Sequence, residues 1–158
     1  MVKRNNLAYH DSYLQYFERL AIHNWLFPES KLHFIGFDEN DGILKPVTSQ
    51  PVIEVDKGGT DAEQQGRAKE AEQAARAHMQ ALGFRKVMVN GQEDWYHPES
   101  GTVVEDLHSE NVVLDKNRRA VVFDPTIYTV PKIGSALERA LIREGLLNPA
   151  NAAAPPAF

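Results

Sequence analysis

Three side chains that offer oxygen ligands follow one another at short spacings in the segment VVEDLHSENVVLDKNRRAVVFDP, residues 103–125. They are Asp106, Asn111 and Asp124. A phosphoryl-transfer site needs a carboxylate that orients the attacking hydroxyl and two oxygen ligands that hold Mg²⁺ on the phosphates. Carboxylate and amide oxygens suit Mg²⁺ or Mn²⁺ better than zinc. The segment therefore points to nucleotide chemistry.

Turn formation is the alternative explanation for these residues. Asp and Asn are common at strand ends because their side chains hydrogen-bond the neighbouring backbone, and any one of them alone is more often a turn former than a ligand. Here all three are flanked by apolar residues typical of strands, and two paired strands would bring Asp106, Asn111 and Asp124 to one rim. The set therefore favours a site over turn chemistry.

Composition limits the classes of protein to consider. The chain has 158 residues, of which 42% are hydrophobic and 25% charged, which suits one globular domain. A formal net charge of −5 argues against nucleic acid as a partner. The absence of cysteine excludes disulfides and thiolate sites. No apolar run is long enough to cross a membrane and no signal peptide is visible, so we expect no membrane partner and a cytoplasmic location.

Three helices are predicted from capping signals and apolar spacing. The first runs from about Ser12 to Leu26, because Pro28 prevents continuation. The second runs from Thr60 to Leu82 and carries one apolar face. The third lies within residues 135–145. We expect these helices to form the scaffold that positions the acidic segment.

Short strands account for most of the remaining chain. An Asp-Gly turn joins LHFIGF to ILKPVTSQPVIEV, where Pro46 and Pro51 mark the second strand as an edge strand or its end. Further candidates are RKVMV, EDWYHP, TVVEDL, NVVLD and RAVVFD. Tight turns join most of them, which predicts an α+β fold with small antiparallel strands and about three helices.

The acidic segment resembles the catalytic loop and the metal-binding loop of the protein-kinase-like fold, with DLHSEN in place of a kinase DLKPEN. The DLH form is similar to that of aminoglycoside- and choline-type phosphotransferases. YLQYFERLAIHNWLFPES, FIGF, VTSQPVI, MQALGF, DWYHPESGTVVEDLHSENVVLD and VVFDP resemble the kinase-like domain of polyvalent proteins of phages and mobile elements. The resemblance covers the chain from Tyr13 to about Tyr128 and is most specific from Asp106 to Asp124.

Roles within the acidic segment follow from this resemblance. It implies that Asp106 is the catalytic base and that Asn111 and Asp124 are the metal ligands, with ATP and Mg²⁺ as cofactors. His108 stands where many kinases place a lysine that touches the transferred phosphate. It could hydrogen-bond a phosphate or hold the loop.

Nucleotide contacts are also implied outside the acidic segment. Residues 48–53 resemble the hinge that reads adenine through backbone groups, which nominates Gln50 and Val52. Glu18 is the candidate for the helix glutamate that pairs with the phosphate-binding lysine. Lys45 is the basic residue nominated to lie near Asp124.

Departures from the kinase pattern are concentrated at the amino terminus. Only eleven residues precede Ser12, without a glycine, and Lys3 is the sole lysine among them, in no predicted strand. We therefore expect one kinase-like domain over 1–147, with a partial small lobe over 12–56 and a reduced large lobe over 60–147. A flexible tail is expected over 148–158.

Three functions remain open at this point. The first is a kinase-like domain that binds nucleotide with Mg²⁺ and transfers phosphate, lacking the glycine-rich loop and the phosphate-binding lysine, with a protein partner or a second copy of the chain completing the site. The second is a pseudokinase that serves as a protein-binding or regulatory module. The third is a metal-dependent hydrolase that uses the acidic residues without ATP.

Overall fold

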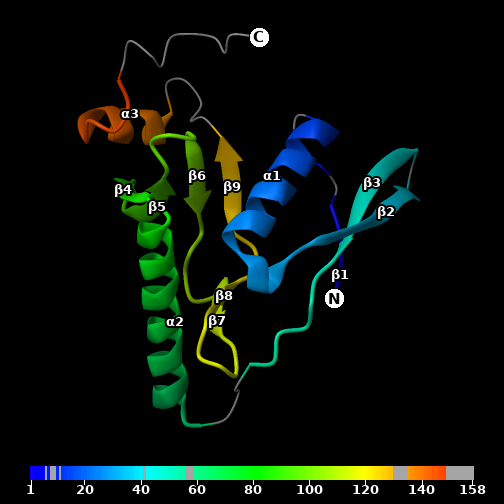
Figure 1. Cartoon of the computed structure of the whole chain (residues 1–158), viewed down its shortest axis with the longest axis horizontal. Coiled ribbons are helices and arrows are strands. Elements are labelled where there is room, and N and C mark those ends of the chain that lie inside the picture. Colours follow the sequence, from blue (N-terminus) through cyan, green and yellow to red (C-terminus); the bar gives the residue numbers. More distant parts are fainter. Residues whose placement is uncertain are drawn as a thin grey trace.

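The computed structural model describes residues 1–5, 7, 10, 12–40, 42–55, 59–129 and 135–148. Its elements, shown in Figure 1, are β1 (Val2–Arg4), α1 (Tyr13–Leu26), the 3₁₀ turn η1 (Pro28–Ser30), β2 (His33–Asn40), β3 (Ile43–Ser49), α2 (Asp61–Ala81), β4 (Arg85–Val89), β5 (Gln92–Tyr96), β6 (Thr102–Glu105), β7 (Val112–Leu114), β8 (Ala120–Val122), β9 (Thr126–Thr129) and α3 (Ala136–Arg143). All strand pairs among the described residues are antiparallel. The predicted α+β class with three α-helices is therefore confirmed within the described residues.

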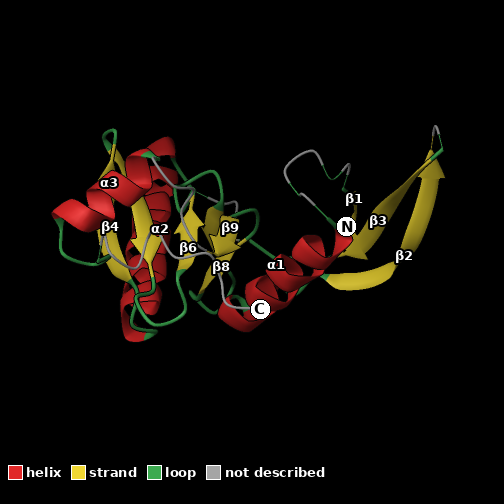
Figure 2. Cartoon of the chain, turned by 90° about the horizontal axis from the view of Figure 1, so that it is seen from above, coloured by secondary structure: helices red, strands yellow, loops and turns green. Residues whose placement is uncertain are grey.

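A three-stranded sheet in the order β1-β3-β2 forms one end of the molecule. Figures 1 and 2 show its β2-β3 hairpin projecting from the rest of the chain beyond α1. The sequence predicts β3 as an edge strand because of Pro46, and this is wrong, since β1 pairs along its other side. The proline is tolerated because β1 ends opposite Val47, and the carbonyl of Pro46 still accepts from Asn5 N at 3.0 Å. β3 does end before Pro51, as predicted.

Helix α1 lies between this small sheet and the second sheet (Figure 2). Ser12 caps it by accepting a hydrogen bond from the backbone N of Gln15, as its sequence signal predicts. Its buried side chains are Tyr16, His23 and Leu26, at the spacing of one helical face. Tyr16 and His23 line a cavity together with Pro125 and Thr126, which follow β8.

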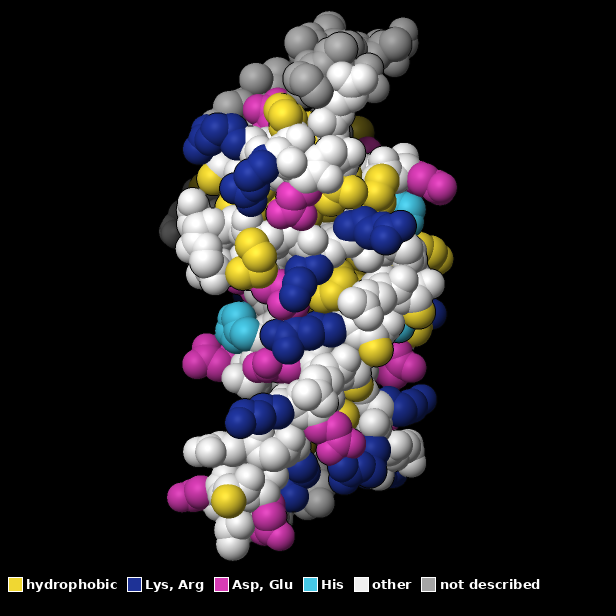
Figure 3. Space-filling model, turned by 90° about the vertical axis from the view of Figure 1, so that its left-hand side faces the viewer, with side chains coloured by type: hydrophobic (Ala, Val, Ile, Leu, Met, Phe, Trp, Pro, Cys, Tyr) yellow, Lys and Arg dark blue, Asp and Glu magenta, His cyan; other side chains and the backbone are white. Residues whose placement is uncertain are grey.

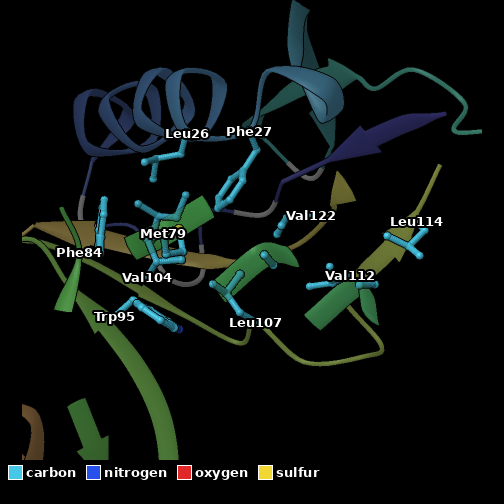
Figure 4. Close-up of a cluster of buried hydrophobic side chains, with 13 residues drawn as sticks. Leu26, Phe27, Met79, Phe84, Trp95, Val104, Leu107, Val112, Leu114 and Val122 are labelled. Carbon is cyan, nitrogen blue, oxygen red and sulfur yellow. The ribbon is translucent and has the colours of Figure 1, made fainter. Parts of the chain in front are cut away.

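The second sheet has the order β4-β5-β6-β9, and both of its faces are covered. Successive residues of a strand point to opposite faces, so neighbours enter different cores. Trp95 and Val104 pack with α2 residues such as Met79 in one apolar cluster, shown in Figure 4. Tyr96 and Val103 pack on the other face with α3. Asp106 follows the last residue of β6 directly, so this part of the acidic segment is anchored on a doubly covered sheet.

Helix α2 supports the sheet and the acidic segment from one side (Figure 1). It begins with the predicted capping box between Thr60 and Glu63. It ends before Gly83, which has a φ of +87° that L-residues rarely adopt. On the described part of the face formed by α2 and α3, Lys and Arg alternate with Asp and Glu without gathering into a patch of one sign (Figure 3).

Other predicted elements are found close to their expected positions, and two strands are additional. The Asn90-Gly91 turn joins β4 to β5, with φ values of 51° and 84°. β1 and β9 were not predicted. The predicted tail lies outside the described residues apart from Asn148. Among the described helices, none has the length and apolar character needed to cross a membrane.

Candidate active site

Asp106 is the first residue after β6 and its side chain is exposed. Its φ of +65° lies in the left-handed region, which is uncommon for a residue other than glycine and turns the chain sharply out of the sheet. The hydroxyl of Thr126, at the start of β9, donates to Asp106 Oδ2 at 2.7 Å. One carboxylate oxygen is thus held from the neighbouring strand, and the group faces solvent.

Asn111 lies directly beside the loop that carries Asp124. Its carbonyl accepts from the backbone N of Phe123 at 2.9 Å, which extends the β7-β8 pairing by one step. Its side-chain Nδ2 donates to the carbonyl of Asp106 at 3.0 Å. The amide nitrogen is therefore directed at the Asp106 loop, and the amide oxygen Oδ1 is the atom available for a cation.

Asp124 forms an ion pair with a lysine from the other end of the chain. Lys3 Nζ lies 2.9 Å from Asp124 Oδ1, although 121 residues separate the two in sequence. Lys3 is the middle residue of β1 and is opposite Thr48 of β3. The expectation that Lys3 has no strand context is therefore wrong: a strand of three residues is too short to show a periodic pattern, and pairing with β3 stabilises it.

His108 is exposed and its ring is oriented by its own loop. The backbone N of Glu110 lies 3.3 Å from His108 Nδ1, which must act as the acceptor because a backbone N–H can only donate. His108 Nε2 lies 3.5 Å from the side-chain Nδ2 of Asn111. The ring therefore contacts its own loop through both nitrogens, and a contact with phosphate stays a prediction.

Two other residues, Lys45 and Glu18, were nominated for the phosphate region. Lys3, and not Lys45, is the lysine that contacts Asp124. Lys45 lies on the β2-β3 hairpin opposite Asp38. Glu18 is exposed, because it lies two residues after Tyr16 and therefore points away from the buried face of α1. The buried face of α1 carries His23 instead.

The nominated adenine-reading segment divides into a buried part and an exposed part. Gln50 is buried, and both its backbone N and O are hydrogen-bonded to Met1 at 2.8 Å. Its side chain donates to the carbonyl of Ser30 at 3.0 Å. Both backbone groups of Gln50 are therefore already hydrogen-bonded within the chain, and its contact with a base stays a prediction. Val52 is 82% exposed and remains accessible.

A buried acidic group lies behind Asp106 and was not predicted from the sequence. Asp94 of β5 is only 6% exposed and is in register with Glu105, one step beyond the Trp95–Val104 pair. Burial, followed by the charges of Glu105 and Asp106, raises the pKa of Asp94 to about 7. The hydroxyl of Tyr128 donates to Glu105, and burial with this bond raises the pKa of the phenol.

This raised pKa predicts a pH-dependent stability. The folded state keeps the Asp94 proton up to about pH 7, whereas the unfolded chain loses it near pH 3.8. Stability should therefore fall as pH rises between these values and stay level above them. We expect Asp94→Asn to remove this fall, with a gain over the wild type that grows up to pH 7 and is at most ~4 kcal/mol. Urea unfolding from pH 4 to 8 measures it.

Glu99→Gln is the control for this experiment, because Glu99 is exposed in the turn before β6. Its curve should run parallel to that of the wild type. If the Asp94→Asn curve is also parallel to the wild type, Asp94 does not hold a proton at neutral pH.

The residues around Asp124 fit a hard divalent cation. Asp124 Oδ1 is engaged by Lys3, but the side chain is 72% exposed and its second oxygen can take a ligand. Asn111 offers its amide oxygen at the same rim, and oxygen donors are those that Mg²⁺ prefers. Among the described residues, no group of three His, Cys, Asp or Glu side chains is arranged to hold a metal ion. The fit therefore rests on two protein oxygens, with other ligands coming from phosphates and water.

The fold and this site together are consistent with a small kinase-like domain: α+β, antiparallel, with a lysine–aspartate pair beside an Asp/Asn loop. Residues 1–131 match the family described as serine/threonine/tyrosine kinase found in polyvalent proteins, and the chain belongs to this family. The resemblance seen in the sequence is thereby confirmed. Comparison with curated proteins and with solved structures gave no match.

Proposed function

We propose that the domain binds ATP with Mg²⁺ and transfers the γ-phosphate, with Asp106 orienting the attacking hydroxyl. Asn111 and Asp124 would hold Mg²⁺, which when bound supplies charge neutralisation on the phosphates. Lys3 would bind a phosphate oxygen. The ion pair between Lys3 and Asp124 is the single observation that carries the proposal.

That ion pair supports phosphate binding better than it supports stability. Asp124 is 72% exposed, and exposed ion pairs contribute only about 0–1 kcal/mol to folding. A lysine beside a candidate metal ligand, however, gives a cation at the place where polyphosphate charge would lie. The sequence shows no glycine-rich strand pair, and Lys3 is the basic group that we propose for phosphate binding.

Asp106 supports the same function through its hydrogen bond. The Thr126 hydroxyl donates to Oδ2 at 2.7 Å and the residue is exposed, so Oδ1 would be the oxygen that accepts from an acceptor hydroxyl. Asn111 couples this carboxylate to the metal side, because its Nδ2 binds the Asp106 carbonyl while its backbone binds Phe123. The proposed base, Asp106, is thus linked by hydrogen bonds through Asn111 to the residue that precedes Asp124.

Thermal melting with Mg-ATP tests the binding part of this proposal. A ligand at a hundred times its Kd stabilises the folded state by about 2.7 kcal/mol, which corresponds to a rise of about 5–10 °C in Tm for a domain of this size. We expect Asp124→Ala to abolish the rise that depends on Mg²⁺. The control is Asp38→Ala, which removes an exposed ion pair with Arg4 in the small sheet.

Two outcomes would contradict the proposal in different ways. The absence of any shift at millimolar Mg-ATP would remove nucleotide binding and favour a pseudokinase that acts as a binding module. A full shift in Asp124→Ala would remove Asp124 from the metal site.

A further inference from the structure

The small sheet exposes a set of large apolar side chains around the β2-β3 hairpin, which Figure 2 shows extending away from the second sheet. Each of them is between 38% and 59% exposed: Tyr13, Phe34, Ile35, Phe37, Ile43 and Leu44. Because side chains of this size cover roughly 150–250 Å² when buried, about 500 Å² of apolar surface is accessible here. A stable interface buries about 800 Å² on each partner, and little more than half of it is apolar. The exposed surface is therefore large enough for the apolar part of such an interface.

The aromatic rings of β2 lie together on the face that packs on α1. The ring of Phe17 in α1 is 5.0 Å from that of Phe34 and 6.3 Å from that of Phe37, both in edge-to-face contact. Residues three apart in a regular strand point to opposite faces. Here the register with β3 shifts between Phe34 and Gly36, so Phe34 and Phe37 share one face and their rings are 5.2 Å apart.

β2 forms one edge of its sheet among the described residues, because the strand order is β1-β3-β2. The outer side of an edge strand carries N–H and C=O groups with which another strand can pair. Proteins that avoid such pairing keep their edge strands very short, whereas β2 has eight residues. The apolar side chains therefore lie beside a backbone edge that is long enough to pair.

The charges along this edge select a second copy of the chain as its occupant. Lys31 and His33 lie at the beginning of the β2 segment, and Asp38 and Glu39 lie near its end. An antiparallel copy would bring the basic beginning of one strand beside the acidic end of the other, whereas a parallel copy would place like charges together. Asp38 is paired with Arg4 in its own chain, so Glu39 is the acidic group offered to a partner.

We propose that two copies of the chain form a dimer through antiparallel contact of their β2 strands, with Phe34 of each copy opposite Phe37 of the other. Because these two residues share one face of β2, this register keeps the rings of both copies in one layer. It also brings Glu39 of one copy to the level of Leu32 of the other, directly beside Lys31. One register thus satisfies both the rings and the charges.

Ile35 and Gly36 lie at the two-fold axis of this dimer, since Phe34 opposite Phe37 continues as Ile35 opposite Gly36. A Cβ added to Gly36 would meet no atom of the described residues within 4 Å. The side chain of Ile35, which is 59% exposed, therefore has room to lie against Gly36 of the other copy. The bulge also falls at the axis, and the pairing of β2 with β3 is continuous on both sides of it.

Analytical ultracentrifugation of the whole chain, without nucleotide, tests this proposal. We expect reversible association from one chain to two between micromolar and millimolar concentration. Ile35→Lys should weaken the dimer by at least about tenfold, because it brings two ammonium groups together at the axis. Met88→Lys is the matched control, since Met88 is 44% exposed but lies on β4 of the second sheet. Its dimer Kd should stay within about twofold of the wild type.

Exchange of Lys31 and Glu39 tests the antiparallel orientation. Lys31→Glu and Glu39→Lys should each weaken the dimer by about fivefold to tenfold, because each places like charges together on both sides of the axis. The double variant restores opposite charges and should return the Kd to within about threefold of the wild type. The two residues are eight positions apart in one chain, roughly 25 Å along an extended strand, so this recovery cannot arise within a single chain.

Each remaining outcome would contradict a stated part of the proposal. A wild-type chain that stays monomeric at millimolar concentration would overturn the dimer and leave this face to a different partner. A dimer that Ile35→Lys does not weaken would show that another surface forms the contact. If Ile35→Lys fails to fold, the charge exchange decides, and a double variant that recovers nothing would overturn the antiparallel register. All of these measurements are made without nucleotide, so they are independent of the Mg-ATP proposal.

Discussion

Lys3→Met is expected to lower Mg-dependent phosphate transfer from ATP by about 10²–10³-fold, the loss typical of removing one group that stabilises the transition-state charge. Methionine keeps the length and apolar stem of the side chain but removes the cation beside Asp124. The γ-phosphate would then lose the ammonium that Lys3 offers from β1 at 2.9 Å from Asp124 Oδ1. Turnover of ATP with water as acceptor measures this loss without knowledge of the natural acceptor.

The Tm of Lys3→Met without ligand shows whether a loss of turnover is due to misfolding. The pair is partly exposed, with Asp124 at 72%, so Tm without ligand should change by only a few degrees. Lys45→Met is the matched control, because Lys45 lies on the same small sheet, on β3 opposite Asp38. Its turnover should stay within a factor of about two. If Lys45→Met loses activity and Lys3→Met does not, the lysine that serves the phosphates is the one nominated from the sequence.

The difference between Lys3 and Lys45 shows what the sequence can reveal about this site. Asp106, Asn111 and Asp124 could be found because they lie within one segment whose strands and turns fix their spacing. Lys3 could not, because its position depends on pairing between β1 and β3, which are separated by α1 and β2. Such non-local pairing leaves no periodic signal in a strand of three residues.

Helix α1 gives a second example of this limit. Its bounds followed from the Ser12 cap and Pro28, and they are confirmed. The expectation that Glu18 faces the phosphate-binding lysine came from the resemblance and not from the helix itself. Because the apolar face is marked by Tyr16 and Leu26, helical geometry alone places Glu18 on the solvent side. The nomination of Glu18 therefore rests on the resemblance alone and stays a prediction.

The burial of Gln50 and of Asp94 also depends on elements that are distant in sequence. Gln50 lies in the segment that resembles an adenine-binding hinge, but Met1, which precedes β1, pairs with its backbone, and the residue is buried. Asp94 lies in the predicted strand EDWYHP, but α3 packs on that face of the sheet and burial makes its negative charge costly. In both cases an element distant in sequence decides whether a polar group meets water.

Asp106→Asn is expected to separate nucleotide binding from phosphate transfer. Asparagine adopts the left-handed conformation readily, which the φ of +65° requires, and its amide oxygen can still accept from Thr126. The variant should therefore fold and keep the full Tm rise with Mg-ATP. It lacks the carboxylate that accepts the proton of the attacking hydroxyl, so turnover should fall by about 10²–10⁴-fold.

Glu110→Gln supplies the comparison within the same loop, since Glu110 is exposed and lies one residue before Asn111. It removes a negative charge near the site but no proton acceptor, and turnover should change by less than about threefold. A fall of similar size in both variants would mean that loop charge, and not the base at Asp106, sets the rate. Unchanged turnover in Asp106→Asn would remove the base role altogether. The geometry argues against both of these outcomes, because Thr126 and Asn111 hold Asp106 in place while the residue stays exposed to an approaching acceptor.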